Sequence, residues 1–176
     1  LLNLVHSNYS IDDTQFFNSA ADALDTDFSN GIIKHSTFRK VGNDAIDISG
    51  SELEIDYLVI DEVGDKGVSA GENSKITINN TYINNCELAI TSKDNSIVRI
   101  NNSKIENSKV GYISFQKKSE FGPGMIYSSN VDLMNVKHKH LIEKKSHLEL
   151  DKVLITSNRK NIEAVLYGNE FGKSSR

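Results

Sequence analysis

The chain has 176 residues, with 24 acidic and 20 basic side chains and a formal net charge of −4. This balance is unfavourable for a nucleic-acid partner, because phosphate backbones attract cationic proteins. No apolar run approaches the roughly 18 residues of a membrane-spanning helix, so we expect no membrane insertion. The single Cys86 excludes an intrachain disulfide.

The sequence repeats with a period of 22 residues. Five segments superpose on this period without a gap, and each of their columns keeps its character. The second position is always Ala or Gly, and the third is always large and apolar. A unit that buries its apolar face only against copies of itself predicts a solenoid. The segments are 22–28, 44–50, 66–72, 88–94 and 110–116.

Within each repeat, apolar and polar residues alternate, as is typical of β-strands. In chain order such runs occur at 55–59, 76–78, 98–100 and 148–150. Clusters of Asn, Asp, Gly and Ser between the runs indicate turns. Three short strands per turn of the solenoid predict an all-β, right-handed parallel β-helix of about seven rungs of about 22 residues. The alternative, a leucine-rich-repeat fold, is disfavoured because the sequence lacks the Leu-x-x-Leu-x-Leu pattern. The rungs are approximately 8–29, 30–51, 52–73, 74–95, 96–123, 124–145 and 146–168.

The register predicts a column of five stacked residues inside the solenoid, namely Leu24, Ile46, Val68, Ile90 and Tyr112. The next residue of each strand then faces outward. At one turn, Asn79 and Asn101 are one period apart, and we expect their amides to stack as an Asn ladder.

We expect one β-helix domain over residues 1–176, with an insertion loop at 115–124 that breaks the period and contains the only proline. Neither the first residues nor the tail 168–176 reads as a polar cap. Because solenoids normally cover their terminal rungs, we expect the chain to be a fragment of a longer protein.

The rung 42–50 (Gly-Asn-Asp-Ala-Ile-Asp-Ile-Ser-Gly) and the Asn-Asn turns at 79–80 and 101–102 resemble the right-handed parallel β-helices of the pectin-lyase-like superfamily. More narrowly, residues 18–50 and 115–124 are similar to uncharacterised exported bacterial β-helix proteins. The resemblance implies an extracytoplasmic location, at the cell surface or secreted. It implies no particular reaction, since the superfamily contains lyases, hydrolases, epimerases, adhesins and modules without known chemistry.

Four acids, Asp22, Asp25, Asp44 and Asp47, are expected to stack along one edge of adjacent rungs. Like charges about 4.8 Å apart repel one another, so the carboxylates need a cation, a neighbouring base or a raised pKa. Three interpretations stay open. Lys66, the next residue in the column of Asp44, can neutralise the edge in a purely structural ladder. Alternatively, the four carboxylates hold Ca²⁺, which prefers about six to eight oxygen ligands.

The third interpretation is catalytic. The acids would hold a cation against a uronate, and Lys66 would abstract the proton beside the carboxyl group, as in a Ca²⁺-dependent polysaccharide lyase or epimerase. The chain departs from the lyase pattern, because no Arg occurs between Arg39 and Arg99.

The insertion loop is the second candidate site, because solenoid insertions often carry ligand contacts. Its aromatic and basic side chains could bind sugar rings and acidic groups, although a loop that merely packs its aromatic residue on the column is the alternative. The predicted ligand-binding residues are Phe115, Lys117, Lys118, Phe121 and Tyr127.

Charge is unevenly distributed along the axis. Residues 1–95 contain 16 acids and 6 bases, whereas residues 96–176 contain 8 acids and 14 bases. Such polarity is compatible with end-to-end self-association or with docking to adjacent domains of the same parent protein. We expect a non-catalytic, extracytoplasmic module that binds acidic or neutral polysaccharide, serves in surface display or docks to other domains. The alternative is the lyase or epimerase acting on uronate polymers.

Overall fold

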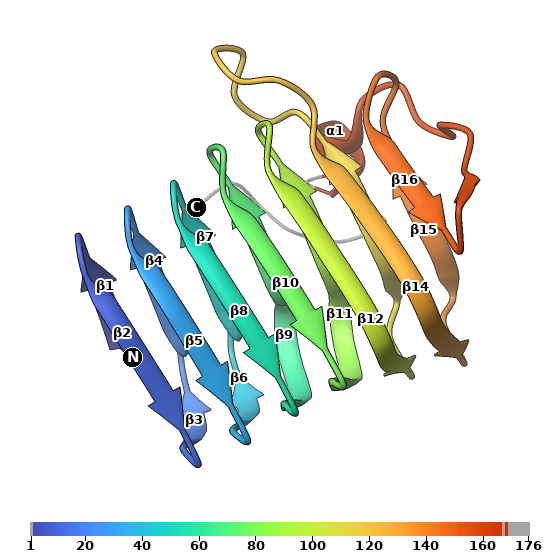
Figure 1. Cartoon of the computed structure of the whole chain (residues 1–176). Coiled ribbons are helices and arrows are strands. Elements are labelled where there is room, and N and C mark those ends of the chain that lie inside the picture. Colours follow the sequence, from blue (N-terminus) through green and yellow to red (C-terminus); the bar gives the residue numbers. More distant parts are fainter. Residues whose placement is uncertain (1, 167, 169–176) are drawn as a thin grey trace.

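The computed structural model describes residues 2–166 and 168, and these residues form a parallel β-helix of seven rungs (Figure 1). The chain runs through three strand positions per rung, and each strand pairs in parallel with its equivalent in the next rung. The strands thus make three stacks, which we call A, B and C. This arrangement confirms the predicted parallel β-helix, its rung number and its three strands per rung.

Stack A contains one strand from each of the seven rungs, with two long strands each contributing only their second half. The strands are β1 (Leu2–Val5), β4 (Leu24–Asp27), β7 (Ile46–Ser49), β9 (Val59–Gly71), β11 (Tyr82–Lys93), β13 (Val110–Phe115) and β15 (His138–Ile142).

Stack B is the other seven-stranded stack. Its strands are β2 (Asn8–Asp12), β5 (Asn30–Lys34), β8 (Glu52–Asp56), β10 (Lys75–Asn79), the first half of β12 (Ile97–Glu106), the first half of β14 (Met125–Met134) and β16 (His147–Leu150). Stack C has six rungs, formed by β3 (Gln15–Ser19), β6 (Thr37–Val41) and the remaining halves of β9, β11, β12 and β14.

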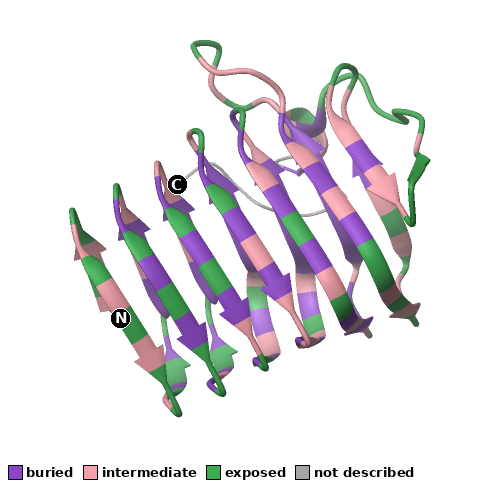
Figure 2. Cartoon of the chain, viewed as in Figure 1, coloured by how far each residue is buried: buried purple, intermediate pink, exposed green. Residues whose placement is uncertain are grey.

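The core is a narrow column of aliphatic side chains between the three stacks. Along most strands, buried and more exposed residues alternate, as Figure 2 shows for stack B, whereas all six residues of β13 are buried. The predicted inner column is confirmed: Leu24, Ile46, Val68, Ile90 and Tyr112 pair in register and are each at most 1% exposed. Cys86 is also buried in this core.

Most corners between stacks contain one residue with left-handed backbone angles, and two corners contain a pair of them, Glu72–Asn73 and Asp94–Asn95. Asn is frequent at these positions because its short polar side chain tolerates this conformation better than most residues do. At the corner after stack C the residues are Asn18, Lys40, Glu62, Asn85, Asn107 and Asn135. This geometry corrects the predicted strand run at 55–59, because Tyr57 has a φ of 54° and is exposed at the corner after β8.

Polar ladders satisfy the backbone at the corners. The hydroxyl oxygens of Ser29, Ser51, Ser74 and Ser96 each accept a hydrogen bond from the backbone N–H of the preceding rung, at 2.9–3.1 Å. The predicted Asn ladder is confirmed, since the Asn101 amide donates to Asn79 Oδ1 at 3.1 Å. These bonds fix the rung-to-rung register without placing unpaired polar groups in the core.

The insertion and the C-terminal segment break the regular pattern. Between β13 and β14 the loop lengthens the rung, so that partners one rung apart are separated by 28 residues, as in Tyr112 and His140. After β16 the chain folds back as β17 (Val153–Leu154), which pairs antiparallel with β16. Helix α1 (Ile162–Leu166) then lies against the outside of stack A. Among the described residues, no helix has the length and apolarity needed to cross a membrane.

Candidate functional site

The outer face of stack A changes character along the axis. One outward column runs from Asp25 and Asp47 through Ser69 and Thr91 to Ile113. The neighbouring column runs from Asp22 and Asp44 through Lys66 to Leu88 and Val110. The face is therefore acidic at Asp25 and Asp47, mixed at Lys66 and mainly apolar from Leu88 to Ile113.

Lys66 lies at the centre of the mixed region. Its Nζ donates to both carboxylate oxygens of Asp44, at 3.2 Å each, and to Asp65 Oδ2 at 2.8 Å. The Asp44 side chain is 3% exposed, and burial raises the pKa of its carboxyl group against the opposing effect of the Lys66 ammonium. Asp44 Oδ1 also accepts the backbone N–H of Lys66 at 3.0 Å. The contact expected for the structural ladder is thus present.

The other acids have separate partners. Asp22 Oδ1 accepts the backbone N–H of Asp44 at 2.9 Å, and Asp25 Oδ2 accepts the amide of Asn3 at 2.8 Å. Asp25 and Asp47 pair directly across rungs, and the pKa of Asp25 is raised by burial and by the nearby Asp27 and Asp47 carboxylates.

The four predicted metal ligands do not converge on one point. Within residues 2–166 and 168, no three His, Cys, Asp or Glu side chains lie close enough together to hold a metal ion. Asp44 is directed to Lys66, whereas Asp47 is approached by Lys93, whose Nζ lies 3.8 Å from Asp47 Oδ1 and donates to Ser69 Oγ at 3.0 Å. Lys93 was missed by sequence reasoning, although it follows Gly71 by one period in an outward column.

The apolar end of this face is covered by the chain itself. Ile162 and Leu166 of α1 belong to a second hydrophobic cluster with Ile113, Phe115 and Leu141, separate from the main core. Phe115, one of the predicted ligand-binding residues, is 3% exposed for this reason. It supports the start of the loop from beneath and presents no ring to the solvent.

The insertion loop is held down by polar contacts. The backbone N–H groups of Lys117 and Lys118 both donate to Asp94 Oδ1 at 2.7 Å, and the Lys118 ammonium pairs with Glu72. The Gln116 amide donates to Phe121 O at 2.6 Å inside the loop. Phe121 is partly exposed. These contacts fix the loop at the corner between stacks A and B.

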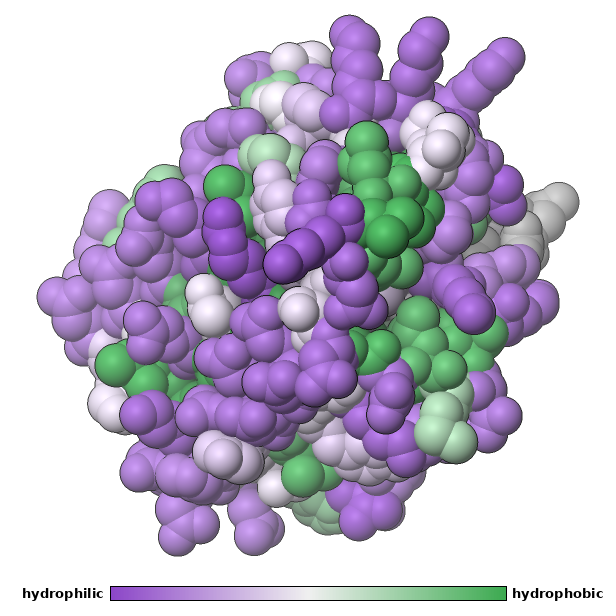
Figure 3. Space-filling view, turned by 45° about the vertical axis from the view of Figure 1, so that its right-hand side comes forward, coloured by the Kyte–Doolittle hydropathy of each residue, from purple (hydrophilic) through white to green (hydrophobic). Residues whose placement is uncertain are grey.

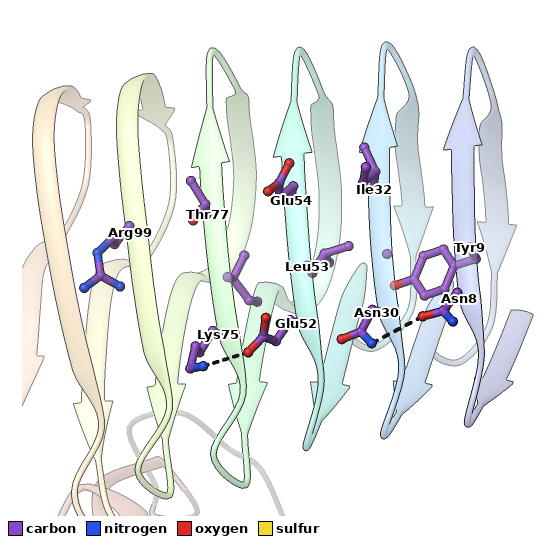
Figure 4. Close-up of a pocket in the computed structure, with 12 residues that line it drawn as sticks. Asn8, Tyr9, Asn30, Ile32, Glu52, Leu53, Glu54, Lys75, Thr77 and Arg99 are labelled. Atoms are coloured by element: carbon purple, nitrogen blue, oxygen red, sulfur yellow. Dashed lines mark hydrogen bonds and ion pairs between the residues drawn. The ribbon is translucent and has the colours of Figure 1, made fainter.

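The outer face of stack B carries a surface hollow with a volume of about 480 Å³ (Figure 4). Its outward side chains come from successive rungs, so that amides, carboxylates and cations follow one another along the axis. Asn30 donates to Asn8 Oδ1 at 3.3 Å, and Lys75 pairs with Glu52 at 2.7 Å. The outward residues are Asn8, Asn30, Ile32, Glu52, Glu54, Lys75, Thr77 and Arg99.

Two charged groups that line this hollow have no charged partner. Among the described residues, the Glu54 carboxylate and the Arg99 guanidinium form no hydrogen bond and no ion pair. Arg99 lies instead over the ring of Tyr127, with its Cζ 5.1 Å from the centroid, and the ring of His147 lies 4.9 Å from that of Tyr127. Tyr127, a predicted ligand-binding residue, thus lies on this face between the Arg99 guanidinium and the tilted ring of His147.

Exposed aromatic rings flank the N-terminal part of the same face. At the corner before β5, the rings of His6 and Phe28 are stacked with centroids 5.3 Å apart. At the corner after it, the rings of His35 and Tyr57 are stacked at 5.5 Å. Phe28 and Tyr57 are more than half exposed. On the side seen in Figure 3, hydrophobic patches are likewise interspersed with hydrophilic side chains.

Stack C offers a partial contrast, because several of its outward charges are paired with one another, whereas the Asp132 carboxylate on the same face forms no hydrogen bond or ion pair within the described residues. Arg39 contacts both Asp61 and Glu62 at 3.1 Å, and Glu106 binds Lys104 and the Tyr82 hydroxyl, each at 2.6 Å. The outer face of stack B thus combines a hollow, charged groups without an ionic partner and flanking aromatic rings. Sequence reasoning missed Glu54, Arg99 and the hollow. The only available signal was their spacing in outward columns.

Residues 3–122 match the family model described as a right-handed β-helix region. The match covers more than half of the chain. No curated protein and no solved structure matches the sequence.

Proposed function

Because the chain belongs to the right-handed β-helix family, we propose that it is a non-catalytic, extracytoplasmic module that binds polysaccharide along the outer face of stack B. The fold supplies a rigid scaffold and leaves the function to its surface. The observation that carries the proposal is the hollow of stack B, where Glu54 and Arg99 are free and exposed aromatic rings stand on both sides.

The geometry suits an extended polymer. Parallel strands repeat every 4.7–4.9 Å or so across a stack, which is similar to the length of one sugar residue along an extended chain. A polysaccharide lying along the axis would therefore meet an equivalent side-chain position at each residue. Glu54 can accept hydrogen bonds from sugar hydroxyls, whereas Arg99 can donate to hydroxyl, ring or carboxylate oxygens. Tyr127 offers a flat apolar surface beside these polar groups.

We place binding ahead of catalysis because of the contacts of Lys66. A lyase would need this side chain to reach a substrate as a base, but its Nζ donates to Asp44 and Asp65. The side chain is also only 15% exposed. Stack B, by contrast, presents groups whose hydrogen-bonding capacity is unused. The extracytoplasmic location follows the resemblance to exported β-helix proteins.

The test is affinity gel electrophoresis of the full chain in gels containing pectate, alginate, a glycosaminoglycan or a neutral glucan. We expect at least one polymer to retard the protein. The double variant Arg99→Ala/Tyr127→Ala should weaken that binding about tenfold or more, equivalent to about 1.4 kcal/mol. A matched control is Lys104→Ala/Tyr82→Ala, because Lys104 lies over the Tyr82 ring on stack C in the same way, 5.9 Å from its centroid.

The control variant should bind like the unaltered chain, and circular dichroism should show that both variants are folded. Absence of retardation by all four polymers would contradict the proposal. Equal losses in the two double variants would place binding away from stack B. Release of unsaturated uronate, followed by its absorbance and abolished by Lys66→Ala, would replace the binding function by a lyase.

A further inference from the structure

The contacts of Lys66 form a buried triad with two carboxyl groups. Its Nζ is equidistant, at 3.2 Å, from both oxygens of Asp44 and lies 2.8 Å from Asp65 Oδ2. The side chains of Lys66, Asp44 and Asp65 are 15%, 3% and 14% exposed. An amine is thus held at hydrogen-bond distance from both oxygens of one carboxyl group, with a second carboxylate beside it, and all three side chains are largely buried.

The surroundings fix this geometry. The backbone N–H of Lys66 donates to Asp44 Oδ1 at 3.0 Å, so the carboxyl group cannot rotate freely. On the other side, Lys66 pairs in register with Leu88, which is fully buried. Buried Ala45 and Ala89 belong to the adjacent column. The ion pair is therefore enclosed between an ordered backbone and apolar groups.

We propose that Lys66 and Asp44 condense into an intramolecular isopeptide bond that links two adjacent rungs. Lys66 Nζ gives up a proton, which Asp65 can carry to the Asp44 carboxyl oxygen, and the nitrogen lone pair then attacks Asp44 Cγ. The C–O bond breaks and water leaves. An ammonium and a carboxylate become a neutral amide and one water molecule, so atoms and charge balance without any oxidant or co-reactant.

Two physical effects favour this product over the ion pair. Groups held in permanent contact can reach effective concentrations of about 10⁵ M or more once Lys66 Nζ moves from the edge to the face of the Asp44 carboxyl group, which drives a condensation that is unfavourable between separate molecules in water. The amide also removes two charges from a desolvated position, where ion pairs are costly to maintain. The reaction would need no external catalyst, because Asp65 already lies at hydrogen-bond distance from the amine.

Other Lys–carboxylate pairs in the described chain lack this combination. Lys109 and Glu87 are 2.6 Å apart, but their side chains are 23% and 29% exposed. Lys75 and Glu52 lie on the open face of stack B and are 60% and 62% exposed. The proposal is thus specific to the triad. It is independent of polysaccharide binding, because the triad belongs to stack A and the hollow to stack B.

The test is intact mass spectrometry of the folded full chain after prolonged incubation at neutral pH. We expect the unaltered chain to be lighter than its sequence mass by one water molecule. The variant Lys66→Arg should retain its full mass, whereas Lys109→Arg, the matched control, should still lose water. Asp65→Asn should slow the loss, because it removes the proton carrier while keeping the size of the side chain.

Proteolysis then locates the bond. Digestion of the folded, incubated chain should give a branched peptide that joins the fragments containing residues 44 and 66. A chain that keeps its full mass overturns the proposal. A water loss that maps to a succinimide within one peptide, or that persists in Lys66→Arg, also overturns it. Circular dichroism of each variant separates loss of the bond from loss of the fold.

Discussion

The packing of Tyr9 against Gly31 makes a sharp test of the core. At the inner position of stack B, five successive rungs carry aliphatic residues, namely Leu53, Ile76, Val98, Ile126 and Leu148. Gly31 interrupts this column, and the Tyr9 ring from the preceding rung occupies the vacant space (Figure 4). A Cβ added to Gly31 would lie 2.1 Å from Tyr9 Cζ.

We predict strong coupling between the two positions. The backbone of Gly31 is not left-handed, so a side chain is excluded only by the Tyr9 ring. Gly31→Ile should therefore destabilise the chain by about 1–3 kcal/mol through overpacking. Tyr9→Val should cost about 2 kcal/mol, since it removes a partly buried ring and leaves a cavity. The double variant restores an aliphatic column, and its cost should fall below the sum of the single costs by about 1–3 kcal/mol.

Urea unfolding followed by circular dichroism gives the three free energies of unfolding. The chain with both residues intact and the pair Ile33→Val/Ile55→Val, deeper in the same stack, serve as references. Additive costs within about 0.5 kcal/mol would refute the packing described for this rung. A Gly31→Ile variant as stable as the unaltered chain would refute it as well.

The remaining predictions concern the core, the acidic edge and the response to Ca²⁺. Ile46→Ala should lower the free energy of unfolding by about 3 kcal/mol, because Ile46 is fully buried, and a loss below about 1 kcal/mol in urea would contradict the stacked core. The pKa of Asp25 is raised in the folded chain, so its ionised form costs stability at neutral pH, and that cost vanishes as the pH falls through the folded pKa and below the ordinary value of 3.8. Asp25→Asn should thus raise the melting temperature slightly at pH 7 and leave it unchanged at about pH 3; a lowered melting temperature at pH 7 would count against the repulsion. Adding Ca²⁺ should leave the melting temperature within error, whereas a rise that disappears in Asp25→Asn/Asp47→Asn would establish the cation site that the sequence suggested.

The fold was predictable because the apolar residues that form its core and the polar residues that form its corners recur every 22 residues in the sequence. The inner column from Leu24 to Tyr112 keeps one spacing, and each corner needs a left-handed residue, so Asn and Asp recur at intervals that can be read directly. The Lys66 contact with Asp44 was foreseen for the same reason, since both residues share a column.

The candidate site was less predictable, because it depends on which outward side chains have partners in the folded chain and which do not. Glu54 and Arg99 look like any other charged residues in the sequence, and only the structure shows that they lack ionic partners, whereas Arg39 and Lys104 on stack C have them. The cover over Phe115 also escaped prediction, because it comes from α1, a short segment outside the repeat. Long-range packing of a non-repeating segment has no periodic signal.

The most direct test of the account measures how binding depends on ligand length. Oligosaccharides of increasing length, prepared from a polymer that retards the chain, can be titrated against isotopically labelled protein and followed by NMR chemical shifts. Because the free groups of stack B lie on successive rungs, affinity should rise with each added sugar residue, and the shifts should spread along the axis from the rung of Arg99 towards that of Asn30. Affinity that stops rising after one sugar residue, or shifts confined to stack A or C, would contradict polysaccharide binding along this face.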